Sequence, residues 1–328
     1  MMTKKISASS LNKVLNIMRQ KRISSLNSLL LLLILGLNFA YCGKTIPNFN
    51  GQRALNDLQT QCAFGPRVPG SEASKNCLLF LEKELQQPAE KVVRQTFQYH
   101  DKLCNKFLVM TNLLASFNIK NNQRIFLAAH WDSRPTADRD PLPENRTKPV
   151  PGANDGASGV AVLMEIARCL QIVAPQIGVD IILFDGEDYG PEGNLDEYFL
   201  GSRYFAEVMR NYRPRYGILL DMVGDAQLSI PVERFSNDYL PQIVQKVWTT
   251  AASLGVSQFE DRLGEYISDD HRMLIEKGIP CIDIIDFDYP DVSQRYWHTL
   301  EDTPDKCSAE SLEAVGKVLL QVIFNELD

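Results

Sequence analysis

Residues 125–188 read IFLAAHWDSRPTADRDPLPENRTKPVPGANDGASGVAVLMEIARCLQIVAPQIGVDIILFDGED. Two short apolar runs, 125–129 and 179–184, have the length and composition of buried β-strands. Between them, residues 156–170 have the apolar spacing of a helix. A buried strand, a helix and a second buried strand, in this order, form the repeating unit of a parallel sheet. The stretch therefore predicts an α/β fold.

The same alternation continues on both sides of this stretch. Helices are predicted at 55–61, 72–87, 198–209, 240–252, 271–277 and 309–327, and strands at 92–99, 108–117, 216–220 and 281–285. We predict a three-layer α/β/α fold around a mixed, mostly parallel, twisted sheet, in which the extended pair before His130 supplies antiparallel strands. No repeat, low-complexity tract or Pro/Gly-rich linker divides the body, so residues 42–328 are expected to form a single domain.

Residues 1–41 have a different composition from the rest. They contain six Lys or Arg and no acidic residue, and an apolar run from Leu29 to Leu37 follows the basic residues. This pattern is typical of a signal peptide, and the run is too short to span a bilayer comfortably. Cys42 stands where a bacterial lipoprotein carries its lipidated cysteine, so lipidation and simple cleavage both stay open. We expect an exported protein that is periplasmic, secreted, or a lipoprotein of the outer surface.

The charge of the mature chain limits its partners. Removal of residues 1–41 would change the net charge from −7 to −13. A strongly acidic protein is a poor ligand for nucleic acids and for anionic membrane surfaces, so we expect no nucleic acid partner.

The chain has seven cysteines, and six remain without Cys42. An exported protein can form disulfides, and Cys62 and Cys77, which flank a stretch that contains Gly and Pro, are the first candidate pair. Cys169 and Cys281 lie in apolar helix and strand patterns, so we expect them to be buried thiols.

Polar residues occur where the predicted strands end. His130 follows one strand, the run DGED (185–188) follows the next, and Asp221 follows a third. Asp155 opens a predicted helix, and His298 lies in a late loop. The carboxyl ends of parallel strands meet at one edge of the sheet, which is where open α/β sheets bind ligands.

Each of these residues alone has a purely structural explanation. Asp155 could be a helix cap or a first-turn acid, and Asp269 could cap a later helix. His130 could be a buried histidine, and Glu187 with Asp188 could be a solvated loop pair. Independent caps would not need to follow three successive apolar strands, so the convergence favours a functional site.

Carboxylates and imidazoles in one site suit zinc. Three protein ligands would leave a fourth position for a carbonyl group or water. Of the two adjacent carboxylates in DGED, one could bind the metal while its neighbour acts as general acid or base. The sequence therefore predicts a zinc enzyme.

Six motifs occur in an order that resembles the M28 zinc aminopeptidase superfamily, which has a zinc exopeptidase fold. They are HWDS (130–133), GANDGASG (152–159), DGED (185–188), LLDMVGD (219–225), SDDH (268–271) and YWHT (296–299). Within the superfamily the chain most resembles glutaminyl-peptide cyclotransferases (glutaminyl cyclases). This narrower resemblance depends on the paired acids of SDDH, on the tryptophan before His298 and on GSRYFAE (201–207). It covers roughly residues 50–328.

The resemblance implies a metal site and a proton-transfer network. Zinc would be held by Asp155, Asp188 and His298, with one ion favoured and two possible. His130 would support these ligands or bind a second ion. The implied catalytic residues are Glu187 as the proton shuttle, with Asp221 and Asp269 in an acidic hydrogen-bond network beside it.

The chain departs from the animal cyclases in three places. Asp188 stands where those enzymes have Glu, the segment 189–199 lacks their pocket tryptophan, and the loop before Trp297 is longer. The resemblance implies that Trp297 forms a wall of the substrate pocket. We expect Tyr289 or Tyr296 to supply the missing aromatic surface.

We therefore predict an enzyme that cyclises the N-terminal glutamine of peptides to pyroglutamate and releases ammonia. The rival is a two-zinc aminopeptidase, in which Asp155 bridges the ions and Glu187 activates water. The sequence keeps every ligand that this rival needs, so both activities stay open. A non-catalytic binding module would be expected to lose ligands and is disfavoured.

Overall fold

The computed structural model describes residues 45–102 and 105–327, and residues 46–328 form one compact unit. The predicted signal peptide and Cys42 lie outside the described residues. Within the described ranges, no helix is both long enough and apolar enough to cross a membrane.

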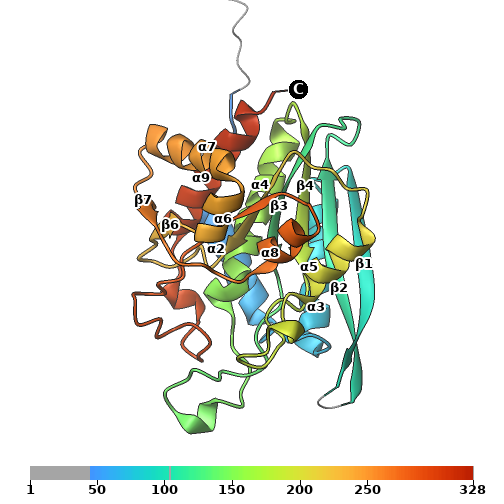
Figure 1. Ribbon diagram of the computed structural model, residues 1–328, viewed down its shortest axis with the longest axis vertical. Helices are drawn as coiled ribbons and strands as arrows, with labels where there is room; N and C mark the ends of the chain where they lie inside the picture. The colour runs from blue at the N-terminus through green and yellow to red at the C-terminus, as the bar shows by residue number, and fades with distance from the viewer. Residues whose placement is uncertain (1–44, 103–104, 328) are drawn as a thin grey trace, which may run out of the picture. The chain divides into compact units, whose positions relative to one another are not determined.

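A six-stranded sheet runs through this unit (Figure 1). In spatial order its strands are β1 (Lys91–Asp101), β2 (Lys106–Phe117), β4 (Gly178–Phe184), β3 (Arg124–His130), β5 (Gly217–Asp221) and β8 (Cys281–Ile285). The last four strands are parallel to one another. By contrast, β2 is antiparallel to both β1 and β4. The sheet is therefore mixed and mostly parallel, as predicted.

Helices cover both faces of the sheet (Figure 1). One face carries α2 (Gly51–Ala63), α3 (Glu72–Gln86), α4 (Gly159–Ile172), α7 (Pro241–Ser253) and α9 (Ala309–Asn325), and the other carries α5 (Leu200–Val208) and α8 (Asp270–Glu276). In β3, Ile125, Leu127 and Ala129 belong to the larger core, whereas Phe126 and Ala128 belong to the smaller one. Because side chains alternate along a strand, a strand between two helical layers must be apolar at every position.

Side-chain caps fix the starts of several helices. Asn50, Ser71 and Ser308 each accept a hydrogen bond from a backbone amide in the first turn of α2, α3 and α9. Such caps satisfy amide groups that have no partner within the helix. As a result α2 begins at Gly51, four residues before its predicted start at residue 55.

Three elements are missing from the sequence-based prediction. The strands β6 (Ile230–Val232) and β7 (Phe259–Leu263) form a separate two-stranded sheet, and α6 (Arg234–Tyr239) precedes α7. The strand β6 has only three residues, and most of β7 is exposed, so neither produces an apolar run. Tertiary contacts stabilise these two strands, and a local sequence pattern does not reveal such contacts.

The described cysteines are all free thiols. Cys169 and Cys281 are buried, as predicted. The candidate disulfide between Cys62 and Cys77 is not formed in the described structure. Cys77 faces the core from the middle of α3, whereas Cys62 is half-buried in the last turn of α2. Burial raises the pKa of Cys62 to about 11 and that of Cys77 to about 12, so both thiols stay protonated at neutral pH.

Candidate active site

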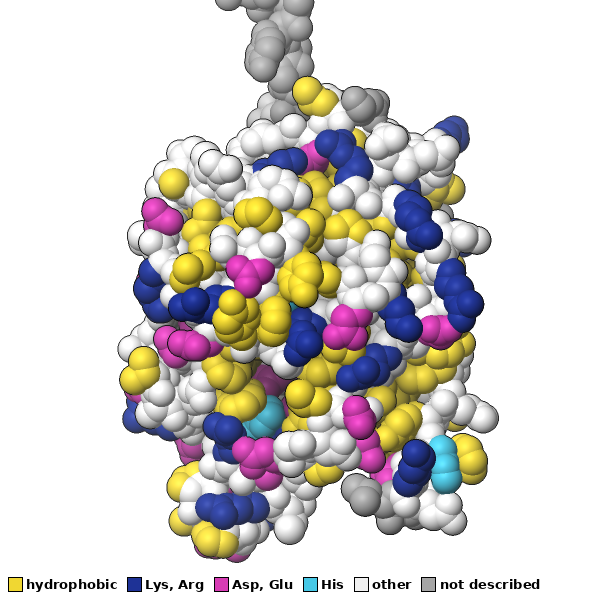
Figure 2. All heavy atoms as spheres, viewed as in Figure 1, with side chains coloured by type: hydrophobic (Ala, Val, Ile, Leu, Met, Phe, Trp, Pro, Cys, Tyr) yellow, Lys and Arg dark blue, Asp and Glu magenta, His cyan; other side chains and the backbone are white. Residues whose placement is uncertain are grey.

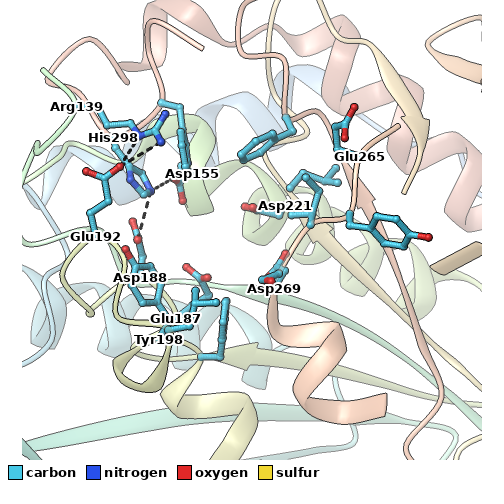
Figure 3. Close-up of a pocket in the computed structure, with 18 of the residues that line it drawn as sticks. Arg139, Asp155, Glu187, Asp188, Glu192, Tyr198, Asp221, Glu265, Asp269 and His298 are labelled. Carbon is cyan, nitrogen blue, oxygen red and sulfur yellow. Dashed lines mark hydrogen bonds and ion pairs between the residues drawn. The ribbon is translucent and has the colours of Figure 1, made fainter. Parts of the chain in front are cut away.

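The predicted polar residues meet at the carboxyl edge of the parallel strands. The strand β3 ends at His130, the run 185–188 follows β4, and β5 ends at Asp221. His130 pairs with Phe184 in the sheet, so the first two strand ends are level. Figure 3 shows that the carboxylates which follow β4 and β5 face the same pocket.

Asp155, Asp188 and His298 form a compact group of possible metal ligands. One ligand atom from each lies within 4.8 Å of the others. The Nε2 atom of His298 lies 3.7 Å from Asp155 Oδ2 and 3.5 Å from Asp188 Oδ1. The three residues come from the turn before α4, the loop after β4 and the loop after β8. Two carboxylates and one imidazole are a donor set that fits zinc.

The surroundings favour the metal-binding form of His298 and hold the backbone of Asp155 in place. Burial, together with the charges of Arg134 and Arg139, lowers the pKa of His298 well below its usual range, so its imidazole is neutral. The backbone around Asp155 is fixed by Asp302, whose Oδ2 accepts a hydrogen bond from the Asp155 amide at 3.3 Å. The site therefore presents a neutral nitrogen beside a fixed carboxylate.

Arg134 and Asp132 are site residues that the sequence-based reasoning missed. Arg134 is buried, and it donates hydrogen bonds to Asp188 Oδ1 at 2.6 Å and to Asp138 Oδ2 at 2.5 Å. Burial raises the pKa of Asp188 well above its usual range, and the charge of Arg134 opposes that rise. The carboxylate of Asp132 accepts hydrogen bonds from the amides of Glu187 and Asp188, at 3.1 and 3.3 Å. Their position directly after β3 is the signal that could have revealed both.

His130 lies among three carboxylates. Its Nε2 is 3.1 Å from Asp155 Oδ1 and 3.2 Å from Asp221 Oδ1, and its Nδ1 is 3.4 Å from Asp132 Oδ1. Burial lowers the pKa of His130, but its three carboxylate partners and the charge of Glu187 raise it well above the usual range. The charges around His130 thus favour its protonated form, and its Nε2 links Asp155 to Asp221.

Glu187 lines the floor of the pocket with Asp221 and Asp269 (Figure 3). Burial raises the pKa of Glu187 well above its usual range, and the charges of Asp188 and Asp269 add to the rise, while His130 opposes it. A carboxyl group whose pKa is raised in this way is a candidate general acid or base.

A buried polar cluster, also missed from the sequence, lies behind Asp269. Asp269 caps α8 by accepting a hydrogen bond from the amide of Asp270 at 2.5 Å. His271 follows, with Nε2 3.4 Å from Glu233 and Nδ1 3.8 Å from Asp283. Asp283 is a charged residue within the apolar strand β8, which is the signal that could have revealed the cluster. These side chains support the pocket floor from behind.

The pocket has a volume of about 310 Å³ and aromatic walls. Figure 2 shows a hollow on this face in which histidine and acidic atoms are visible between hydrophobic side chains. Trp297 lines the pocket, its ring centroid 4.9 Å from that of Phe287, and Tyr198 and Phe199 contribute from the segment after DGED.

The structure corrects the expectation for the remaining aromatic wall. Among the described residues, Tyr289 and Tyr296 are not part of the pocket lining. Tyr289 is fully buried, and its hydroxyl donates a hydrogen bond to Asp302 at 2.9 Å. Tyr296 packs against Tyr289, with ring centroids 5.3 Å apart. The loop before Trp297 therefore directs Phe287 toward the pocket and the two tyrosines away from it.

Comparisons with known proteins agree with this geometry. The sequence pattern of peptidase family M28 matches residues 112–323. Glutaminyl-peptide cyclotransferase from Boiga irregularis is 25% identical over 297 residues, which cover 80% of this chain and 78% of that protein. The crystal structure of Tannerella forsythia glutaminyl cyclase is 42% identical, has a TM-score of 0.81, and covers 85% of this chain and 100% of that one. A leucine aminopeptidase precursor from Bacteroides thetaiotaomicron is 37% identical, with a TM-score of 0.82 and coverage of 86% and 99%.

Proposed function

The chain belongs to peptidase family M28, and from this premise we propose that it is a zinc-dependent glutaminyl cyclase. It would convert the N-terminal glutamine of a peptide to pyroglutamate and release ammonia. The observation that carries the proposal is the group of Asp155, Asp188 and His298 beside Glu187, in a pocket walled by Trp297. The similarity to a solved glutaminyl cyclase supports this choice among the activities of the family.

Asp155, Asp188 and His298 would hold the zinc ion. Zinc bound there would supply a Lewis acid that polarises the γ-amide carbonyl of the substrate glutamine. The chain keeps the ligands in place through Asp302, which fixes the backbone at Asp155, and through Arg134, which holds Asp188. Hydrogen bonds of this kind orient metal ligands.

Glu187 is the residue that would move the proton. The α-amino group of a peptide has an ordinary pKa of about 7.7–8.0, so it must lose a proton before its nitrogen attacks the γ-carbon. The amine loses that first proton to solvent. As the neutral nitrogen attacks the γ-carbon it loses a second proton, which Glu187 would accept, because burial and the charges of Asp188 and Asp269 raise the pKa of its carboxyl group. When the bond between the γ-carbon and the amide nitrogen breaks, Glu187 gives the proton to the leaving nitrogen, which departs as ammonia. Asp221 and Asp269 line the same floor and would share the proton.

The aromatic wall would protect this reaction from water. Trp297, Phe287 and Tyr198 line the pocket around the acidic floor. Water that reached the γ-carbon would compete with the α-amine and yield glutamate instead of pyroglutamate. Exclusion of water also strengthens the electrostatic interactions within the site.

A two-zinc aminopeptidase is the second candidate. His130, Asp155 and Glu187 form another group of possible ligands, and one similar structure is described as a leucine aminopeptidase precursor. His130 Nε2 lies 3.1 Å from Asp155 and 3.2 Å from Asp221, so these side chains are close enough to share a second ion. The similarity to a solved glutaminyl cyclase makes the cyclase our first proposal.

Mass spectrometry of a Gln-initiated peptide, incubated with the purified zinc-loaded protein, separates the two candidates. We expect the product to have lost ammonia and to retain every residue. Loss of the whole first residue would contradict the cyclase and establish the aminopeptidase. A matched peptide that begins with alanine is the control, because only an aminopeptidase can change it.

A further inference from the structure

The segment 265–269 leads from solvent to the pocket floor. All five of its residues line the pocket. Glu265 and Tyr266 are exposed, the next two residues are half-buried, and Asp269 is buried. The amide of Ile267 donates a hydrogen bond to Glu233 Oε1 at 3.1 Å, which ties the segment to the buried cluster behind the floor. The segment therefore forms one side of the path by which a peptide would enter.

The opposite side of the mouth carries a charge pair that is already balanced. Arg139 donates hydrogen bonds to Glu192 Oε1, at 3.3 Å from Nε and 3.2 Å from Nη2. The guanidinium of Arg139 also lies 4.2 Å from the ring centroid of Trp297. Figure 3 shows this pair across the pocket from Glu265. Among the described residues of the lining, Arg139 is the one Lys or Arg, and Glu192 balances its charge on this side of the mouth.

Glu265 is an acid at the mouth whose charge is not balanced. In the described part of the chain, its exposed carboxylate has neither a hydrogen-bond partner nor an ion pair. Tyr266 beside it is 54% exposed, and its hydroxyl donates a hydrogen bond to Asp238 at 3.0 Å. Arg234 is the cation near this ring, at 5.6 Å from its centroid, and its Nε donates to Gly264 O at 2.6 Å. An exposed ring beside a free carboxylate is a surface suited to a cationic side chain.

We propose that Glu265 and Tyr266 form a subsite for a lysine or arginine side chain at the second position of the substrate peptide. The inference builds on the proposed function, in which the N-terminal residue lies at the floor. Four residue steps separate Asp269 from Glu265, which corresponds to at most about 14 Å. Two extended substrate residues span about 7 Å of this distance, and a long basic side chain covers the rest. Its methylene groups would lie on Tyr266 and its charge beside Glu265.

Steady-state kinetics on three peptides that differ only in the second residue tests the subsite. The peptides carry Gln-Lys, Gln-Ala or Gln-Glu at the N-terminus, and the readout is the ratio of kcat/KM between them. For the native chain we expect Gln-Lys to be favoured over Gln-Ala, and Gln-Ala over Gln-Glu. In Glu265→Gln the ratio of Gln-Lys to Gln-Ala should fall about 3- to 5-fold through KM, which is the scale of an exposed ion pair. Added salt should reduce the same ratio in the native chain.

Two further variants complete the experiment: one reverses the charge at position 265, and the other removes an acid outside the pocket. Glu265→Lys should shift the preference toward Gln-Glu. Glu310→Gln removes an exposed carboxylate outside the pocket lining and should leave all ratios unchanged. An unchanged ratio of Gln-Lys to Gln-Ala in both Glu265 variants, with native melting temperatures, would overturn the subsite. The product identifies the reaction separately: if the peptides are trimmed and not cyclised, the proposed function fails, and the same rate ratios still decide the subsite.

Discussion

Arg134 Nη1 lies 2.6 Å from Asp188 Oδ1, so a buried guanidinium shares the carboxylate that is assigned to the metal. A positive charge this close could repel zinc, or it could keep Asp188 ionised and correctly oriented. The burial of Asp188 decides between these effects, because burial raises its pKa and a protonated carboxyl group is a poor ligand. Arg134 therefore supports metal binding more than it opposes it.

Arg134→Gln is accordingly expected to weaken zinc binding about 10- to 100-fold, the range found when a group that orients a metal ligand is removed. The measurement is competition for zinc with a chelator of known affinity. Arg94→Gln is the matched control, because it removes an exposed Arg–Glu pair, with Glu82, outside the site. Tighter zinc binding by the Arg134 variant would show that repulsion dominates.

Glu187→Gln is expected to separate catalysis from metal binding. Glutamine has nearly the same shape but cannot accept the proton of the α-amine, so kcat should fall about 10²- to 10⁴-fold. Zinc content should stay at the native level, because Glu187 is outside the assigned ligand set. Asp196→Asn, an exposed change in the following loop, is the control for both readouts. Near-native turnover with zinc retained would remove Glu187 from the mechanism.

The number of zinc ions can be decided at His130. If His130 is an imidazolium between Asp155 and Asp221, both the native chain and His130→Asn should bind one zinc per chain, measured by elemental analysis after gel filtration. The variant should turn over more slowly, because the two carboxylates lose their common partner. Asp155→Asn should bind zinc much more weakly whether the native site holds one zinc ion or two. Two zinc ions in the native chain and one in His130→Asn would instead support the aminopeptidase arrangement.

The core of the fold could be predicted because its information is local. Every residue of the run 125–129 is apolar, since the strand contacts helices on both faces, and this uniformity is visible in one dimension. The strands β6 and β7 have no such apolar run. Contacts with other parts of the chain stabilise them, and their own composition does not predict them. Local pattern therefore predicted the main sheet and missed the small one.

The candidate site was also predicted only in part from the sequence. Asp155, Asp188 and His298 stand in motifs whose order could be recognised in the sequence, and the structure brings them together. Arg134 could not be found, because an arginine in a loop is usually solvated, and its burial beside Asp138, Asp188 and the ring of Tyr198 appears only in the folded chain. Sequence also could not tell which aromatic ring of the late loop faces the pocket, since the hydroxyl of Tyr289 turns inward to Asp302, a residue that lies behind Asp155 and outside the lining.

Asp286, which follows β8, predicts a pH dependence of stability that is separate from the site. The side chain is buried, and its Oδ2 accepts a hydrogen bond from the amide of Ser229 at 2.9 Å. Burial raises its pKa from the ordinary 3.8 to about 7. Between these values the folded chain holds a proton that the unfolded chain has released. The free energy of unfolding should therefore fall by about 1 kcal/mol per pH unit as the pH rises from about 4 to 7.

Asp286→Asn removes this dependence, because asparagine is neutral at every pH and can still accept the hydrogen bond from Ser229. The melting temperature of the variant, minus that of the native chain, should rise by several degrees between pH 5 and pH 7 and then level off. Both proteins are compared with a chelator present, so that the pH dependence of zinc binding does not contribute. Asp261→Asn, at an exposed position in β7, should show a constant difference. A constant difference for Asp286→Asn as well would mean that Asp286 is ionised in the folded chain throughout this range, because only a buried acid that keeps its proton produces the slope.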